Sequence, residues 1–321
     1  MDKLKLRGRT FSPAFGASGV QGLFDETREY KYKKYYEFIP GYSFDGMTFV
    51  AKTFTYNPHK GYTELGKNGY SIKRFFPSSI KVYPFDGAVL NAVGLSNPGL
   101  AVLANYGKWQ KRKDNFFLSY MPVGKTKEER IDETVKTKWM LERATESILP
   151  RIGLQVNYSC PNTEHGQLEL IDEIETHLEI LNELGIPLVP KFNITLSPLI
   201  AKRILDHPLV DAICVSNTVP WGMFPDQIDW NRFGKNGVSP LAKFNGGGLS
   251  GSPIFPLICS WLEELNKLQP TKPVIACGGV MSIYDFYRLR DIACVDGVSI
   301  GSVAMLRPWR VQEIIDEILD V

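Results

Sequence analysis

The sequence lacks closely spaced cysteines, long apolar runs and a strong charge of either sign. Its cysteines are odd in number, widely spread and without a Cys-x-x-Cys pair, which argues against a disulfide framework and against a zinc or iron–sulfur site held by this chain alone. No run of about eighteen apolar residues occurs, so a membrane-spanning helix is not expected. The first residues also lack the apolar core of a signal peptide. We therefore expect a reduced, cytoplasmic protein that binds no metal.

The net charge is +2, from 37 lysines and arginines against 35 aspartates and glutamates. This balance gives no field strong enough to favour nucleic acid or membrane insertion. The run 28–37 is rich in tyrosine, and its glutamates offset its lysines, so we expect a solvated helix there rather than an RNA-binding site. Hydrophobic residues make up 44% of the chain, enough for a large core. Because repeats and linkers are absent, we expect residues 1–321 to form a single domain.

Short apolar runs recur along the chain and are separated by helical patterns. Most of these runs are continuously apolar rather than alternating, as expected of parallel strands that are buried on both faces. The predicted strands span residues 46–52, 88–94, 116–121, 153–159, 188–193, 212–217, 273–278 and 297–301. Eight strands with helices between many of them predict an α/β fold, a closed (β/α)8 TIM barrel.

Three helices have clear boundary signals. Thr126 and Glu129 have the spacing of a capping box, and Ile131, Val135 and Trp139 follow at four-residue intervals. The other two are indicated by Ile171, Ile174, Leu178 and Leu181 before Gly185, and by Val311, Ile314, Ile315 and Ile318 after Pro308.

Two regions, 54–83 and 219–246, are too long for simple connections between a strand and a helix. Both follow predicted strands, so we expect extended loops over the C-terminal mouth of the barrel, where active sites form. Either loop is a candidate lid.

The end of the fourth predicted strand reads Asn157-Tyr158-Ser159-Cys160-Pro161-Asn162. A positioned and shielded cysteine can exchange a proton with carbon, and asparagines both donate to and accept from a planar, amide-rich heterocycle. The alternative is that Cys160 is a small buried side chain and that the two asparagines cap a turn.

Two lysines, Lys52 and Lys191, also fall at the ends of predicted strands. A lysine in this position must reach a polar site or an anion, because burying an unpaired ammonium is costly. One such lysine is often a side chain that extends to solvent, whereas two at one face fit a bound anionic cofactor or substrate better. Asn91 and Asn217 are further polar residues at strand ends, although each by itself is a common turn residue.

Glycines complete the pattern. The segment 246–251 precedes a predicted helix, Gly278 and Gly279 follow the seventh strand, and Gly301 and Ser302 follow the eighth. Backbone amides after strands seven and eight are the usual phosphate site of such barrels, and glycine lets the chain approach a phosphate closely.

Taken together, these residues resemble the dihydroorotate dehydrogenases, particularly the soluble class 1 enzymes with a catalytic cysteine, over nearly the whole chain. The most specific piece is the segment 157–162, in which class 2 enzymes have serine in place of the cysteine. The other matching pieces are Phe15-Gly16-Ala17-Ser18-Gly19-Val20, Asn91-Ala92-Val93-Gly94-Leu95, Gly247-Gly248-Leu249-Ser250-Gly251 and Ala276-Cys277-Gly278-Gly279-Val280.

The resemblance implies FMN as cofactor and assigns a role to each matching residue. Cys160 is implied as the base that takes the C5 proton of dihydroorotate while hydride passes to flavin N5. The residues implied to hold the flavin and its phosphate are Ala17, Ser18, Gly19, Lys52, Asn157, Lys191, Gly251, Gly278, Gly279, Gly301 and Ser302. Those implied to hold the pyrimidine and its carboxylate are Lys52, Asn91, Asn157, Asn162, Asn217 and Thr218.

The implied reaction is the oxidation of (S)-dihydroorotate to orotate in de novo pyrimidine (UMP) biosynthesis. The resemblance also implies a homodimer and a possible iron–sulfur flavoprotein as electron-transfer subunit. It leaves fumarate, NAD⁺ and a quinone open as electron acceptors.

Two departures from the family separate this chain from its typical members. After Lys52 the family's Gly-Asn-Pro-x-Pro-Arg stretch is reduced to Asn57-Pro58, and the usual Gly-Ala before the last strand is replaced by Ala293-Cys294-Val295-Asp296-Gly297. These changes indicate a rebuilt barrel mouth.

There are three alternatives to dihydroorotate oxidation. Dihydropyrimidine dehydrogenases, which act on dihydrouracil and dihydrothymine, share the Asn-x-Ser-Cys-Pro core but have histidine where Asn162 stands. Dihydrouridine synthases expect a tRNA-binding extension and a basic face. A non-catalytic barrel that binds a phosphate ligand or flavin would not need Cys160 beside two lysines.

Overall fold

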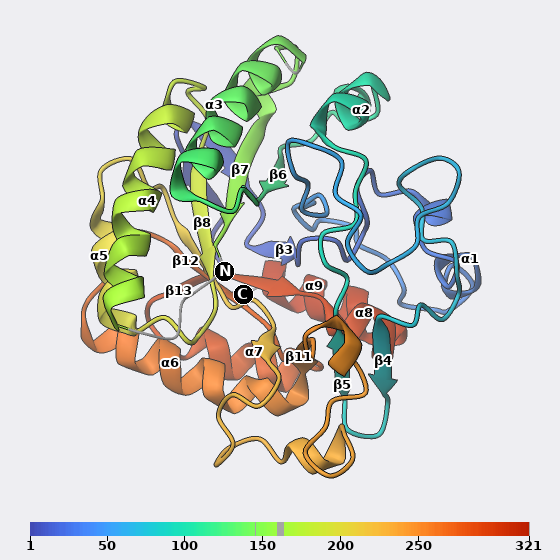
Figure 1. Cartoon of the computed structure of the whole chain (residues 1–321). Helices are drawn as coiled ribbons and strands as arrows, with labels where there is room; N and C mark the ends of the chain where they lie inside the picture. The colour runs from blue at the N-terminus through green and yellow to red at the C-terminus, as the bar shows by residue number, and fades with distance from the viewer. Residues whose placement is uncertain (145, 159–163, 321) are drawn as a thin grey trace.

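The structure is a computed structural model that describes residues 1–144, 146–158 and 164–320. Within these residues, parallel strands form one curled seven-stranded sheet in the order β3-β13-β12-β9-β8-β7-β6 (Figure 1). In that order the strands are Ala14–Gly16, Val295–Ile300, Val274–Cys277, Ile213–Val215, Leu188–Phe192, Ile152–Asn157 and Phe116–Tyr120. Their side chains are almost all buried, as the continuously apolar runs predict.

The extended segment 48–54 joins the two edges of this sheet. It forms parallel bridges to β3 on one side, at Thr48, and to β6 on the other, at Val50 and Phe54. Backbone hydrogen bonds support both contacts, with the amide of Thr48 2.8 Å from the carbonyl oxygen of Ala14 and the amide of Ala51 2.9 Å from that of Phe117. The segment therefore acts as an eighth stave, and the TIM-barrel prediction is confirmed.

One strand prediction is wrong, and one barrel strand was not predicted. The run 88–94 is not a barrel strand: β5 (Ala88–Asn91) lies in a separate antiparallel sheet of order β10-β11-β5-β4. The other members of that sheet are β4 (Ile80–Tyr83), β10 (Val219–Pro220) and β11 (Gly248–Gly251). The run is apolar because β5 is flanked by β11 and β4 and buried. The missing barrel strand is β3, which is too short to show a period.

Helices cover the outside of the barrel, with α3 packed beside α4, α4 beside α5, α5 beside α6 and α7 beside α9 (Figure 1). The long helices are α3 (Lys127–Ala144), α4 (Glu164–Asn182), α5 (Pro198–Asp206), α6 (Phe255–Lys267), α7 (Ile283–Arg290) and α9 (Val311–Asp320). The short ones are α1 (Lys33–Tyr36), α2 (Leu100–Asn105) and α8 (Ser302–Leu306). Single 3-10 turns are η1 (Thr27–Glu29), η2 (Trp109–Lys111), η3 (Leu149–Arg151), η4 (Trp230–Arg232), η5 (Ala242–Phe244), η6 (Ser252–Ile254) and η7 (Pro308–Arg310).

The predicted capping box of α3 is present, but its predicted apolar face is wrong. The amide of Glu129 donates to Thr126 Oγ1 at 3.2 Å, and the amide of Thr126 lies 3.4 Å from the Glu129 carboxylate. Trp139, however, is 60% exposed, whereas Leu141 is fully buried. The inner face of α3 also contains threonines, so apolar spacing alone indicated the wrong side.

The other two helix predictions are confirmed. In α4 and α9 every predicted inward residue is buried: Ile171, Ile174, Leu178, Leu181, Val311, Ile314, Ile315 and Ile318. Gly185 follows α4 with a φ of 62°, the left-handed conformation typical of a helix stop.

The barrel interior is filled from below. A hairpin of β1 (Leu4–Leu6) and β2 (Arg9–Phe11) places Leu4, Leu6 and Phe11 in the same apolar cluster as Phe117. A Cβ at Gly153 would lie 2.3 Å from the Phe117 ring, so glycine is needed there for the ring to occupy the interior. Because the floor is closed, a ligand can enter only at the carboxyl ends of the strands.

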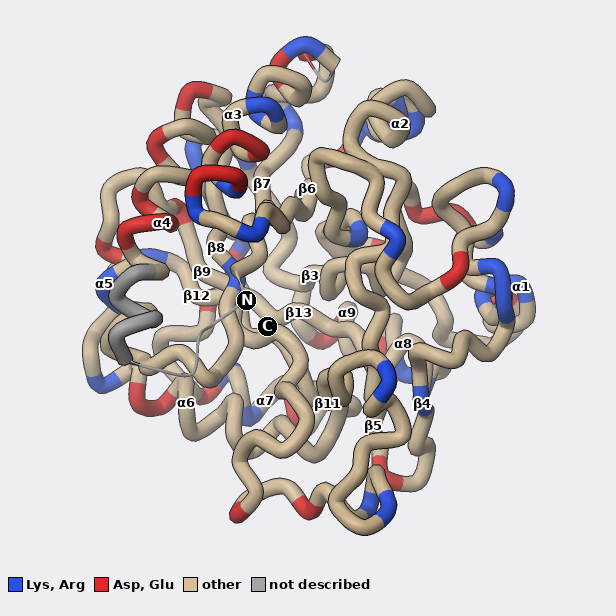
Figure 2. Tube along the Cα trace, in the orientation of Figure 1, with Lys and Arg blue, Asp and Glu red and all other residues tan. Residues whose placement is uncertain are grey.

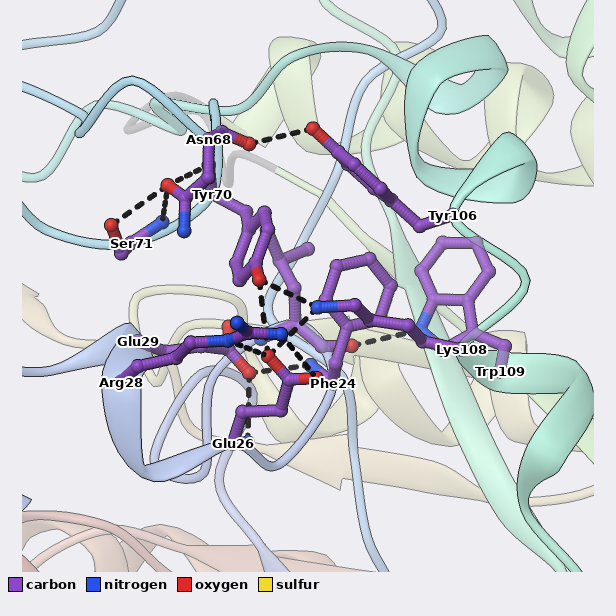
Figure 3. A network of polar contacts seen from close by, with 11 residues as sticks. Phe24, Glu26, Arg28, Glu29, Asn68, Tyr70, Ser71, Tyr106, Lys108 and Trp109 are labelled. Atoms are coloured by element: carbon purple, nitrogen blue, oxygen red, sulfur yellow. Dashed lines mark hydrogen bonds and ion pairs between the residues drawn. The ribbon is translucent and has the colours of Figure 1, made fainter.

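A polar network fixes the segments that rim this mouth (Figure 3). The Glu29 carboxylate accepts hydrogen bonds from the amides of Phe24 and Glu26 at 2.8 and 3.1 Å. Lys108 Nζ donates to the Glu26 carboxylate at 2.7 Å and to Tyr70 Oη at 2.6 Å. This network connects three segments that are distant in sequence, and it anchors the long region 54–83.

The long region 54–83 does lie at the mouth, and it meets the region 219–246. Tyr83 Oη donates to the carbonyl oxygen of Phe233 at 2.6 Å, and Asn245 Nδ2 donates to Tyr62 Oη at 3.2 Å.

Acidic and basic residues are interspersed along the described trace (Figure 2). None of the helices in the described part of the chain is both long and apolar enough to cross a membrane.

Candidate active site

A cavity of about 400 Å³ opens at the carboxyl ends of the barrel strands. Its walls come from strand ends around the barrel, from the N-terminal segment and from the antiparallel sheet. No aspartate or glutamate is among its described lining residues. A second hollow, of about 590 Å³, is lined by residues such as Thr10 and Asp25, and it includes none of the predicted site residues that the structure describes.

Most of the predicted site residues meet in the first cavity. Those that line it are Ala17, Ser18, Gly19, Lys52, Asn91, Asn157, Lys191, Asn217, Thr218, Gly278, Gly301 and Ser302. Gly251 and Gly279 are adjacent in sequence to the lining residues Ser250 and Gly278 but do not line the cavity. Cys160 and Asn162 lie outside the described residues.

Both lysines lie at the cavity, where Lys191 is buried and Lys52 is half-buried. Lys52 lies within the eighth stave and donates from Nζ to the carbonyl oxygen of Ser96. Burial lowers the pKa of Lys52 to about 8. Lys191 lies near the end of β8 with 4% of its surface exposed, and its Nζ is 3.5 Å from Cys277 Sγ. Because the described lining has no carboxylate, these ammonium groups make the cavity attractive to an anion.

Asn157 is held by hydroxyl groups and has one acceptor that no described residue uses. Its Nδ2 donates to Thr53 Oγ1 at 2.7 Å and to Ser119 Oγ at 2.9 Å. Ser18 Oγ lies 2.8 Å from the same Thr53 oxygen. Asn157 Oδ1 is buried and has no hydrogen-bond partner among the described residues. An unsatisfied buried amide oxygen at a cavity wall is suited to accept from a ligand N–H.

The glycines bring backbone close to the cavity. Gly278 and Gly301 follow the neighbouring strands β12 and β13, and both line the cavity. Gly278 has a φ of 118°, and Gly279 has a φ of 81° with a position where a Cβ would lie 2.5 Å from Phe255 Cβ. Beside them, Ser302 Oγ donates to Ser250 Oγ at 3.0 Å. Backbone amides and hydroxyls are the donors that a phosphate group requires.

The antiparallel sheet supplies another wall. Asn91, at the end of β5, is paired with Gly248 of β11, and Thr218 precedes β10 of the same sheet. A Cβ at Gly248 would lie 2.1 Å from Thr218 Oγ1, so glycine is needed for this close approach. Asn91 thus reaches the cavity from this antiparallel sheet. The sequence predicted that it would come from a barrel strand, and this prediction is wrong.

The tyrosine-rich run 28–37 is not a solvated helix. The run contains the end of the 3-10 turn η1 and the four-residue helix α1, and Lys33 within α1 is buried. Tyr30 and Tyr32 stack with ring centroids 5.5 Å apart, and both line the cavity. Burial raises the pKa of both phenols, so they stay protonated. Alternation of Tyr30 and Tyr32 is the signal that could have indicated one shared face.

Sequence reasoning also missed Thr53, Ser119, Cys277 and Ser250. Thr53 follows Lys52 directly, so its position at a strand end could have indicated it. Ser119 was not, because it lies inside β6 and acts through Asn157. Cys277 was interpreted only as part of a glycine motif, although it lines the cavity beside Lys191.

Behind the end of β7 lies a buried group of polar side chains. Tyr158 and His177 stack with centroids 5.9 Å apart. Arg130 donates to both carboxylate oxygens of Glu173 at 2.6 Å, and this carboxylate is 4.0 Å from His177 Nε2. His177 is fully buried, and neither ring nitrogen has a partner among the described residues. Burial lowers the pKa of His177 to about 4, so the ring is neutral near pH 7.

His177 should make the protein less stable in acid. Its folded-state pKa lies below the usual 6.5, so its contribution is complete above pH 6.5 and is lost as the pH falls toward 4. We expect a loss of up to about 3 kcal/mol in the free energy of unfolding from this group. In His177→Phe, urea unfolding between pH 7 and 4.5 should show a smaller loss than in wild type. His207→Gln is the control, and parallel curves for all three proteins would contradict the prediction.

Comparison with known proteins gives one consistent result. The family model described as "Dihydroorotate dehydrogenase" matches residues 48–321. The catalytic subunit of dihydroorotate dehydrogenase B (NAD⁺) from Caldicellulosiruptor saccharolyticus is 28% identical, over 79% of this chain and 77% of that protein. The same subunit from Staphylococcus carnosus is 25% identical, over 76% of this chain and 75% of that protein.

Solved structures agree on the fold. A structure described as DHODH in complex with ferulenol from Eimeria tenella superposes with a TM-score of 0.64 and 18% identity, covering 99% of this chain and 83% of the other. The family model begins at the eighth stave and includes the strands that end at Asn157, Lys191 and Gly278. The chain belongs to the dihydroorotate dehydrogenase family, whose members are oxidoreductases that act on CH–CH donors.

Proposed function

We propose that this protein catalyses the FMN-dependent oxidation of (S)-dihydroorotate to orotate, the redox step of de novo pyrimidine (UMP) biosynthesis. The observation that supports this most strongly is the pair of lysines, Lys52 half-buried and Lys191 buried, in a cavity without a described carboxylate. Two cations in one enclosed space suit two anionic or electron-rich groups, which here are the phosphate-bearing cofactor and the carboxylate of the substrate.

The described residues fit FMN at several points. The cavity has the volume and enclosed position of a cofactor site. Asn157 Oδ1, which has no partner among the described residues, would accept from a ring N–H group of the flavin, and Lys191 would provide an ammonium to its electron-rich edge. The backbone at Gly278 and Gly301, with the Ser302 hydroxyl, would bind the phosphate. Ala17, Ser18 and Gly19 would line the flavin.

Lys52 would bind the substrate carboxylate. Its pKa, lowered to about 8 by burial, leaves the ammonium form predominant at neutral pH, and a bound carboxylate would favour that form further. Asn91, Asn217 and Thr218 lie in the same cavity and would donate to or accept from the pyrimidine amides. An uncharged dihydropyrimidine would leave the Lys52 ammonium without an anionic partner, which favours dihydroorotate over dihydrouracil.

Cys160 would act as the base. It stands between Asn157, the last residue of β7, and Glu164, the first of α4. In this role its sulfur takes the proton from C5 of the substrate, and Asn157 and Asn162 orient the ring. FMN, when bound, supplies the acceptor for the hydride that leaves C6.

The test is anaerobic mixing of the purified holoprotein with dihydroorotate. We expect the flavin absorbance to bleach with dihydroorotate and to change far less with dihydrouracil at the same concentration. If dihydrouracil bleaches the flavin and dihydroorotate does not, the substrate is dihydrouracil and not dihydroorotate. A purified protein that neither contains nor takes up FMN would refute the proposal as a whole.

We further propose that electrons leave through a partner subunit. The relatives reported above are named as catalytic subunits of an NAD⁺-linked enzyme. Three exposed aromatic residues follow the cavity-lining Tyr32 and Ile72 closely in sequence. Tyr35 and Phe75 are 62% and 42% exposed with ring centroids 5.8 Å apart, and Phe76 is 82% exposed. An exposed apolar surface of this kind is typical of a contact site. Offering the reduced enzyme fumarate, NAD⁺ and a soluble quinone will test this, because direct rapid oxidation by NAD⁺ would make a partner unnecessary.

A further inference from the structure

Three side chains from neighbouring strands meet at the floor of the cavity. Lys191 of β8 is paired in register with Cys214 of β9, and Cys214 is paired with Ile275 of β12. Cys277 is two residues beyond Ile275 on the same strand, so its side chain lies on the same face, inside the barrel. Lys191 and Cys277 line the cavity, and Cys214 is fully buried.

The contact between Lys191 and Cys277 is direct and enclosed. Nζ and Sγ are 3.5 Å apart, and each residue has only 4% of its surface exposed. A buried ammonium needs a counter-charge, because desolvating it alone is costly. The described lining of the cavity offers no carboxylate, so the nearest group able to become negative is the Cys277 thiol.

The surrounding groups favour charge on one sulfur and not on the other. A hydrogen bond from the Cys214 thiol, together with the Lys191 ammonium and the Ser299 side chain of β13, lowers the pKa of Cys277 well below its usual value. The same hydrogen bond and burial raise the pKa of Cys214, against smaller opposing effects of the Lys191 ammonium and of Gln155 of β7. Burial would lower the pKa of Lys191, but the sulfur of Cys277 raises it overall.

We propose that Cys277 is a thiolate paired with the Lys191 ammonium, and that it serves as a positioning residue which keeps this ammonium charged and directed into the cavity. The pairing itself depends only on the described geometry, whereas its role toward the flavin rests on the proposed function. Without the thiolate, burial is the dominant influence on Lys191, and the ammonium is lost at a lower pH.

The first test uses flavin-free protein and does not depend on activity. The ultraviolet absorbance of thiolates, measured as wild type minus Cys277→Ser, should show one thiolate at pH 6, and the Lys191→Met background should show none. Alkylation by iodoacetamide, in which the sulfur displaces iodide, should label Cys277 at pH 6 at least about tenfold faster with Lys191 present than in Lys191→Met. Cys214 serves as the internal control and should stay unlabelled.

The second test connects the pair to flavin binding. FMN affinity of the wild type should stay level between pH 6 and 8, whereas that of Cys277→Ala should fall as the pH rises, because Lys191 loses its proton. Absence of thiolate absorbance at pH 6 would overturn the ion pair. A thiolate with parallel FMN profiles in both proteins would overturn the positioning role. Failure to bind FMN in any form would refute the proposed function but leave the thiolate result intact.

Discussion

Replacing Cys160 with alanine should leave FMN bound and slow its reduction by dihydroorotate by about 10²–10⁴-fold, the usual contribution of a positioned acid–base group. The change removes only the group that takes the C5 proton. Cys160 is not among the residues expected to hold the flavin, and the cavity residues that are expected to do so are unaltered. Stopped-flow measurement of flavin bleaching under anaerobic conditions gives the rate directly.

The control for this variant is Cys294→Ala. Cys294 precedes β13, at the opposite end of the barrel from the cavity, and its Sγ donates to the carbonyl oxygen of Leu262 at 3.6 Å. Its variant should reduce the flavin at the wild-type rate. Equal rates in wild type and Cys160→Ala would remove Cys160 from the mechanism. Loss of flavin from Cys160→Ala would instead assign it a role in cofactor binding.

Replacing Lys191 with methionine should abolish stoichiometric FMN. Removing one partner of a buried charged contact costs about 2–5 kcal/mol, or roughly 30-fold to several thousandfold in Kd. The fold itself should tolerate the change, because Cys277 then stays a neutral thiol and no unpaired charge is left buried. Flavin absorbance of the purified protein, followed by titration with FMN, measures the loss.

A matched control is Lys272→Met. Lys272 precedes β12 and donates from Nζ to the carbonyl oxygens of His207 and Val210 at 2.6 and 2.8 Å, away from the cavity. This variant should purify with the wild-type flavin content. A full complement of FMN in Lys191→Met, with unfolding curves like those of wild type, would show that Lys191 does not hold the cofactor.

Local sequence patterns predicted the architecture because most barrel strands are continuously apolar and end in polar residues. That rule identified Asn157 and Lys191 before any contact was known. It failed for β3, which has three residues and no visible period, and for β5, whose burial comes from an antiparallel sheet. Burial shows that a strand is covered but not what covers it.

The parts of the site that escaped prediction depend on contacts between distant segments. Ser119 matters because it accepts from Asn157, and Cys277 because it is 3.5 Å from Lys191. A residue's identity does not reveal its neighbour 38 or 86 positions away. Tyr30 and Tyr32 were not predicted for a different reason. A run with many charged residues is usually exposed to solvent, whereas here the fold directs these two tyrosines into the cavity.

The stave formed by residues 48–54 gives the barrel a seam. It is joined to β3 and β6 by isolated bridges, and between them the amide of Lys52 turns away to the carbonyl oxygen of Gly22 at 2.8 Å. Because its pairing consists of isolated bridges and not of a continuous ladder, we expect a lower free energy of local opening here than in the regular staves. A ligand that contacts both Ala17, after β3, and Lys52, within the stave, would hold the two sides of this seam together. Its binding energy therefore stabilises the cylinder at its weakest line, and saturation with ligand should slow amide hydrogen exchange there first.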